Sequence, residues 1–324
     1  MSTCSATQNL HPSLVMSKRR KFVIAVLFCM SAVAVIAFLA HRQDPEPAYA
    51  GHPLSFWVEI LGRRSPPWGD TQGATNAIAH IGPASLPLLL KWIQHEPAQW
   101  RDKLAAPLKR LPYEWTHWLS ACIAQERSEQ LAIGTYEAFH ILGTRATPAL
   151  EDLSRLMNAT NATATSARAT ENLGCLGTNA LAALLAVIQD PRHPRQWQAV
   201  AAVGSMPDMG DAAKLSVPAI IACIGNTNDE TLSLMAVNVI GRLRAAPDLS
   251  VPALVCCLQS TNAIIRISSA EAIAAFGTQA TSAIPALTNM LTDPDPELRD
   301  CAAKTLHEIA PSTFTNVPPP HHID

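Results

Sequence analysis

Apolar and polar positions along the chain recur with a long helical period. Six helical runs each end in an apolar residue followed by glycine, and after a short polar loop a second apolar run begins, usually at a proline. From Pro148 onward the steps between these second-run markers are 34, 36, 34 and 33 residues. A fixed period of this size is typical of stacked supersecondary units. The glycines are Gly82, Gly143, Gly177, Gly204, Gly241 and Gly277, and the markers are Pro87, Pro148, Ala182, Pro218, Pro252 and Pro285.

The first run of each unit carries one apolar stripe. Residues four before and one before the glycine are apolar in every unit, as Ile273 and Phe276 illustrate. Positions three apart share one side of an α-helix, so this stripe predicts a buried face. The residue five before the glycine is alanine in every unit except one, where it is Asn172. We expect small residues there to let neighbouring helices approach closely, and each glycine to end its helix in a left-handed conformation.

The second run also carries an apolar stripe. Its members lie one residue before, two residues after and five residues after the marker position, as Val251, Leu254 and Cys257 illustrate. Proline is tolerated in the first turn of a helix, so each marker proline is expected to lie there. The unit is therefore predicted to be a helical hairpin. The unit around Gly204 departs from this pattern, with a predicted long loop from Ser205 to Ser216.

These units resemble bacterial HEAT repeats of the short type. The segment from Ala270 to Leu287 carries the resemblance, together with Leu291-Thr292-Asp293-Pro294 and the helix opening at Glu297-Leu298-Arg299. The resemblance implies an all-α fold, a solenoid of about six to seven hairpins over residues 53–310, used for protein–protein contact and without fixed catalytic residues. The segment from Tyr49 to Trp57 resembles the lead-in of membrane-anchored HEAT proteins of bacteria.

Residues 22–40 form an uncharged apolar run. At about 1.5 Å per residue such a helix spans about 28 Å, close to the thickness of a bilayer core. The basic residues of the tail 1–21 precede it, so the positive end is expected to stay cytoplasmic and the linker 41–52 and the repeats to face the periplasm. We predict a single-pass bacterial inner-membrane anchor. The alternative is a signal peptide cleaved after Ala50, at Ala48-Tyr49-Ala50, which would release the repeats.

An insertion at about residues 95–130 interrupts the period, since Pro87 and Pro148 are 61 residues apart. It combines aromatic and basic side chains, which are favoured anchors at protein interfaces. One interpretation is a docking surface; the other is an amphipathic extra helix that braces the first units. The candidate protein-binding residues are Trp100, Arg101, Lys103, Lys109, Arg110, Tyr113, Trp115 and Trp118.

Net charge is −2 and only 15% of residues are charged, without the basic stripe that nucleic-acid binding requires. No phosphate-binding glycine loop, zinc motif, nucleophile elbow or dinucleotide fingerprint occurs in the sequence, so we predict no enzyme activity, no cofactor and no metal. Cys223 and Cys257 are predicted to be core residues, and Cys256 an accessible thiol. Asp293, Asp295 and Glu297 are interpreted as helix-start residues. The Pro-rich tail 311–324 is predicted to be disordered.

The hypothesis is a non-catalytic, membrane-anchored scaffold that binds a protein partner on the extracytoplasmic side, in a groove lined by the second helices. The sequence names no particular partner. Two rivals remain: an enzyme similar to the HEAT-like bilin lyases, acting on a protein-bound cofactor, and a structural envelope protein.

Overall fold

The computed structural model describes residues 46–63, 71–97, 127–225 and 229–311. The chain divides into two compact units after Glu46, and the elements below belong to the unit that begins at Pro47. Within the described residues this unit is helical apart from one pair of two-residue strands. The predicted all-α class is therefore confirmed for this part of the chain.

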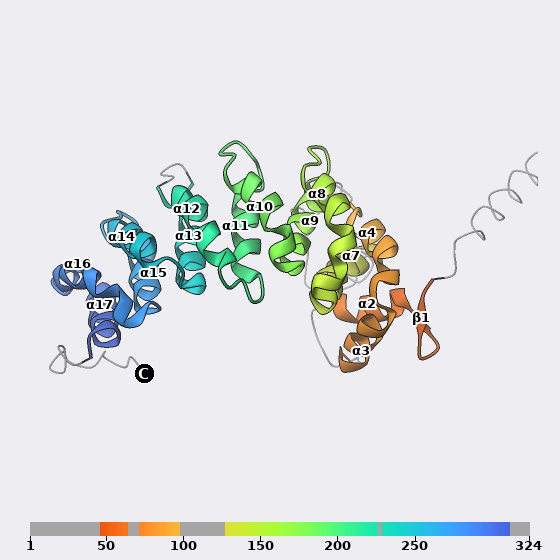
Figure 1. The fold of residues 1–324 in the computed structure, drawn as a ribbon, viewed down its shortest axis with the longest axis horizontal. Coiled ribbons are helices and arrows are strands. Elements are labelled where there is room, and N and C mark those ends of the chain that lie inside the picture. The colour runs from red at the N-terminus through yellow and green to blue at the C-terminus, as the bar shows by residue number, and fades with distance from the viewer. Residues whose placement is uncertain (1–45, 64–70, 98–126, 226–228, 312–324) are drawn as a thin grey trace, which may run out of the picture. The chain divides into compact units, whose positions relative to one another are not determined.

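Helical hairpins follow one another along the chain, and consecutive hairpins lie side by side (Figure 1). The first helices are α3 (Thr71–Ile81), α7 (Arg127–Leu142), α9 (Thr163–Cys175), α11 (Gln196–Ser205), α13 (Glu230–Leu243), α15 (Ala263–Ala274) and α17 (Pro296–Ile309). The second helices are α4 (Leu86–Ile93), α8 (Leu150–Met157), α10 (Leu181–Ile188), α12 (Ala212–Ile224), α14 (Pro247–Cys257) and α16 (Ile284–Met290).

Four hairpins turn through a short 3₁₀ segment. These segments are η1 (Gly82–Ser85), η2 (Gly143–Ala149), η3 (Gly177–Ala180) and η4 (Gly277–Ala283). From α7 onward each first helix packs against the next one, α7 on α9, α9 on α11, and so on to α17. The first helices therefore form one continuous layer, and the second helices lie beside it.

The described unit opens with a small sheet and one extra helix. Strand β1 (Ala48–Tyr49) pairs antiparallel with β2 (His52–Pro53), and α2 (Leu54–Gly62) follows directly. The Trp57 indole N–H donates a hydrogen bond to the Tyr49 carbonyl oxygen at 3.3 Å. Tyr49 also contacts the ring of His80 in α3. Helix α2 packs on both α3 and α7, so this lead-in is joined to the first hairpins.

The predicted stripes form the core. Residues four before the glycine are fully buried in all six units: Ile78, Phe139, Leu173, Val200, Val237 and Ile273. Most residues two and five after the marker position are buried as well, including Leu254 and Cys257 in α14. Only a few members, such as Ile81 and Leu150, are half-buried. The register read from the sequence is therefore confirmed.

The glycines have two different roles, and one of them was not predicted. Gly82, Gly143, Gly177 and Gly277 have positive φ values of 54–65° and end their helices as expected. For Gly204 and Gly241 the prediction was wrong, because both lie inside helices. A Cβ at Gly204 would lie 2.6 Å from Val239 Cγ2, and one at Gly241 would lie 2.8 Å from Ala272 Cβ. These two glycines are needed because the next first helix approaches too closely for a side chain.

Three marker prolines were also misplaced. Pro87 and Pro285 lie in the first turn, as predicted. Pro148 lies in the 3₁₀ segment η2, before α8 begins. Pro218 and Pro252 instead lie inside α12 and α14, because these helices begin several residues before the proline. For the same reason the loop after α11 is shorter than predicted, and spans residues 206–211. The helix extends toward its N-terminus because Ala213 and Val217 can join the buried stripe.

Candidate binding surfaces

The docking residues predicted in the insertion lie outside the described residues. This holds for all of them: Trp100, Arg101, Lys103, Lys109, Arg110, Tyr113, Trp115 and Trp118. The anchor segment 22–40 and the tail 312–324 lie outside them as well. These predictions stay predictions, and the candidate surfaces below come from other parts of the molecule.

Three neighbouring second helices expose an apolar surface, which we call the second-helix face, with the charged residues Asp211, Lys214 and Asp248 at its edge. In α12 and α14 its members are spaced i, i+3, i+7, so they share one side of each helix. They occupy equivalent positions in consecutive repeats, and α12 contacts both α10 and α14. The face consists of Ala182, Ala186, Leu215, Pro218, Ala222, Leu249, Pro252 and Cys256, all of them exposed.

Two leucines dominate this face. Leu215 is 71% exposed and Leu249 is 53% exposed, each three residues before its marker proline. The equivalent residues on either side are polar, Asn179 before α10 and Ser282 before α16. The exposure of Cys256 agrees with the sequence prediction. The leucine pair was missed, although two leucines in a column whose other members are Ala84, Arg145, Asn179 and Ser282 were a signal in the sequence.

A second candidate is a cleft in the layer of first helices, the α7–α9 cleft. It has a volume of about 520 Å³, within the usual range for ligand sites. Residues of α7, α9 and the C-terminal end of α2 line it. The lining residues are Leu61, Gly62, Arg63, Ala132, Ile133, Thr135, Tyr136, Glu137, Arg168, Glu171 and Asn172.

Opposite charges balance each other in the α7–α9 cleft. Arg168 is held in place by two backbone carbonyls, donating to Ile93 at 2.9 Å and to His95 at 2.5 Å. Desolvation raises the pKa of the Glu171 carboxyl, although part of the side chain is exposed, and the Arg168 cation opposes that shift. Desolvation also raises the pKa of the Tyr136 hydroxyl, so it stays protonated and able to donate at neutral pH.

One residue of the cleft lacks the contacts that its chemistry requires. Asn172 is 1% exposed, and neither its amide nitrogen nor its amide oxygen has a hydrogen-bond partner. Two buried hydroxyls elsewhere are satisfied locally: Ser85 donates to the Gly82 carbonyl and Ser216 to the Ala213 carbonyl. The sequence shows Asn172 as the one exception in a column of alanines, but only the structure shows that its amide has no hydrogen-bond partner.

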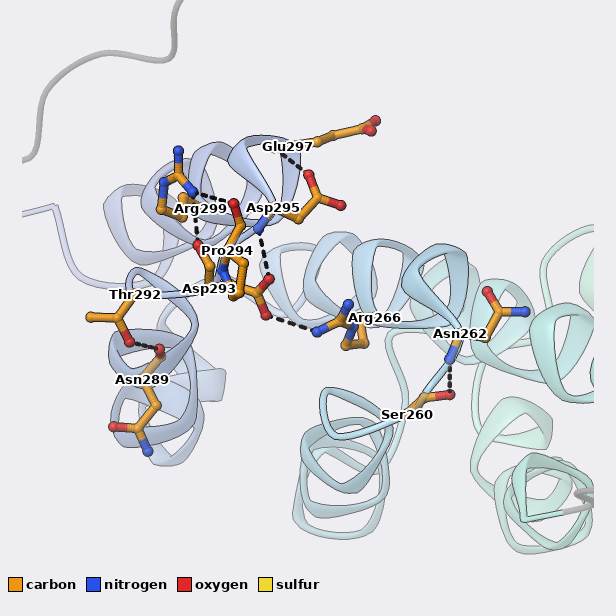
Figure 2. A network of polar contacts seen from close by, with 10 residues as sticks. All are labelled: Ser260, Asn262, Arg266, Asn289, Thr292, Asp293, Pro294, Asp295, Glu297 and Arg299. Atoms are coloured by element: carbon orange, nitrogen blue, oxygen red, sulfur yellow. Dashed lines mark hydrogen bonds and ion pairs between the residues drawn. The ribbon is translucent and has the colours of Figure 1, made fainter.

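The carboxylates before α17 have a structural role (Figure 2). The Asp295 side chain accepts from the Glu297 backbone N–H at 3.0 Å, which makes it the N-cap of α17. Asp293 bridges two repeats, because it accepts from Arg266 of α15 at 2.8 Å and from the Asp295 backbone N–H. Arg299 donates to the carbonyls of Asp293 and Pro294. The helix-start interpretation of Asp295 is confirmed.

The described cysteines are free thiols: Cys175, Cys223, Cys256, Cys257 and Cys301. Burial raises the pKa of Cys175 to about 12 and that of Cys301 to about 11, so both are protonated at physiological pH. Across the described ranges, no group of three or more side chains is placed to hold a metal ion. No helix in the part of the chain that the structure describes is long and apolar enough to cross a bilayer.

Stacked helical hairpins with a continuous core define an α-solenoid repeat protein. A family model for HEAT repeats matches residues 251–316, which agrees with this fold and covers the second part of α14 together with α15, α16 and α17. No curated protein sequence matches the chain significantly.

Solved structures support the same architecture. The chain is similar to the karyopherin Kap121p bound to the extreme C-terminus of the protein phosphatase Cdc14p, with a TM-score of 0.51, 14% identity and 79% of this chain covered. Kap121p bound to Pho4p gives a TM-score of 0.50 and 15% identity, again over 79% of this chain. The match spans 29% of each karyopherin chain. At these identities the likeness shows the fold alone.

An enzyme is also among the similar structures. Human deoxyhypusine hydroxylase matches at 16% identity, covering 79% of this chain and 95% of its own, with a TM-score of 0.33. A likeness this weak carries no argument about catalysis. The comparisons therefore support a helical repeat scaffold and give no evidence for or against an activity.

Proposed function

We propose that this chain is a membrane-anchored scaffold that binds another protein through its second-helix face. The observation that carries the proposal is the apolar surface shared by α10, α12 and α14, with Leu215 and Leu249 exposed on it. Large apolar side chains that line up on adjacent helices mark an interaction site rather than the scattered exposure of an ordinary surface. Stacked repeats suit this role because each hairpin adds area to the same face.

The partner is a protein that presents an apolar segment without charge. An ionic segment would lose hydration beside the apolar side chains of this face, and the neighbouring charges Asp211 and Lys214 are already paired with each other. Fully burying one leucine contributes about 1.5–3 kcal/mol, so each leucine accounts for roughly tenfold or more in affinity. The neighbouring surfaces are polar, since α8 exposes Glu151 and Arg155, and α16 exposes Asn289. The face therefore has defined edges.

Anchoring through residues 22–40, with the repeats on the extracytoplasmic side of a bacterial inner membrane, is part of the same proposal. It is supported by the uncharged run and the basic residues before it. Retention of the anchor is supported by the packing of Tyr49, because cleavage after Ala50 would remove strand β1 from the hairpin with β2. Protease treatment of spheroplasts tests the topology. A C-terminal epitope that resists protease until the membrane is permeabilised would contradict it.

Site-specific crosslinking tests the binding face. A photo-crosslinking amino acid replaces Leu215 in one full-length variant and Ser282 in another, since both lie three residues before a marker proline. We expect a discrete crosslinked species from position 215 in intact cells, and its loss when Leu249→Asp is added. The matched control Ser282→Asp should leave it unchanged. Equal crosslinking from both positions, or no effect of Leu249→Asp, would refute the assignment of this face.

A further inference from the structure

Asn172 interrupts the column of small residues that brings first helices together. The equivalent residues of α7, α11, α13 and α15 are Ala138, Ala199, Ala236 and Ala272, all of them buried. A buried amide without partners costs about 1–3 kcal/mol, which alanine at this position would avoid. Residues that weaken a fold in this way are found where function requires them.

The same substitution lies beside the cleft. Between α13 and α15 the alanine of this column meets a glycine, and a Cβ at Gly241 would lie 2.8 Å from Ala272 Cβ. In α9 the larger Asn172 takes the place of that alanine. Asn172 itself lines the α7–α9 cleft.

The lining of the cleft indicates what it binds. The lining carries two arginines, Arg63 and Arg168, and two glutamates, Glu137 and Glu171. Arg63 is already paired with Glu59 beside the cleft, so the cleft does not favour an anionic ligand. Leu61 and Ile133 add apolar surface. A primary amide presents a donor and an acceptor side by side, which complements the N–H and C=O of a peptide main chain. The terminal torsion of asparagine is soft, so the amide of Asn172 can turn toward a ligand in the cleft.

We propose that the α7–α9 cleft binds an extended peptide segment of a partner protein, with Asn172 pairing to its main chain. The cleft lies between first helices, so this site is separate from the second-helix face and does not depend on it. Along α7 the cleft is lined only between Ala132 and Glu137. At about 1.5 Å per residue this stretch is about 9 Å long, which matches roughly two to three residues of extended chain. The apolar side chains of such a segment would contact Leu61 and Ile133.

A peptide selection tests the proposal. The probe is a displayed library of random linear 12-residue peptides, panned on the full-length chain in detergent with the Asn172→Ala variant as counter-selection. We expect peptides whose affinity falls at least tenfold in Asn172→Ala. The matched control Asn289→Ala, which removes an exposed amide on α16, should leave their affinity unchanged.

Backbone methylation of a selected peptide then separates main-chain from side-chain recognition. Methylating one amide nitrogen at a time should abolish binding at one or two positions and have little effect elsewhere. The Leu215→Asp variant should bind the peptide normally, so that a failure of the second-helix face would not be mistaken for a failure of the cleft. No peptide that distinguishes wild type from Asn172→Ala, or tolerance of methylation at every position, would overturn the proposal.

Discussion

Replacing Gly134 by alanine should loosen the joint between α2 and the repeats. Gly134 lies where α7 crosses α2, and a Cβ there would overlap the Val58 carbonyl oxygen and lie 3.0 Å from the backbone nitrogen of Gly62. A Cβ at Gly62 would in turn overlap the Gln130 carbonyl oxygen. Backbone atoms in two helices cannot rotate away as a side chain can, so the helices themselves must separate.

The magnitude follows from two opposing effects. Overpacking typically costs about 1–3 kcal/mol, while alanine in a helix interior is favoured over glycine by about 0.5–1 kcal/mol. A gap of about 0.5–1 Å already removes a quarter to a half of the dispersion attraction between the buried faces. Leu54 and Val58 of α2 are fully buried and would lose such contacts. The net expectation is a loss of about 1–2 kcal/mol, local to α2.

Hydrogen exchange followed by mass spectrometry suits this prediction, because repeat proteins open locally. A loss of about 1.4 kcal/mol raises the exchange rate of the α2 amides roughly tenfold. Gly225→Ala is the control: this glycine has a negative φ, and no atom lies within 4 Å of the position that a Cβ would occupy there. Slower exchange in α2 of Gly134→Ala, as intrinsic helix propensity alone predicts, would refute the close-crossing argument.

Two further predictions follow from ionisable groups. The Glu96 carboxylate accepts hydrogen bonds from the Ala164 and Thr165 backbone N–H groups at the start of α9. Desolvation raises the pKa of Glu96, but these hydrogen bonds and the Arg168 cation lower it by more, so the pKa lies below 4.5. Its stabilisation is therefore present above the unfolded-state pKa and lost as pH falls through the folded-state pKa. The urea midpoints of wild type and Glu96→Gln should therefore differ at pH 7 and converge in acid, below the folded-state pKa. Iodoacetamide at pH 8 should label the exposed Cys256 before Cys175 and Cys301, because pKa values of about 12 and about 11 keep those two thiols protonated. Peptide mapping after labelling of the native chain checks this order. Early labelling of Cys175 would contradict the prediction.

The sequence by itself determined the repeat and the identity of its buried faces. Apolar side chains three residues apart share one side of a helix whatever surrounds it, so Ile273 and Leu254 could be assigned to the core. The N-cap role of Asp295 was equally local, because a cap depends on the residues that immediately follow it. The four glycines that end helices were predictable for the same reason.

Only the tertiary structure decided what happens between helices that are distant in sequence. Gly204 and Gly241 have the same sequence context as the helix-ending glycines, yet Val239 and Ala272 of the next helices determine their role. The cleft beside Asn172 depends on how far α7 and α9 can approach, and the α2–α7 crossing depends on a contact between segments far apart in the chain. Periodicity fixes which side of a helix is buried, whereas the distance between two helices depends on the shapes of both surfaces at once.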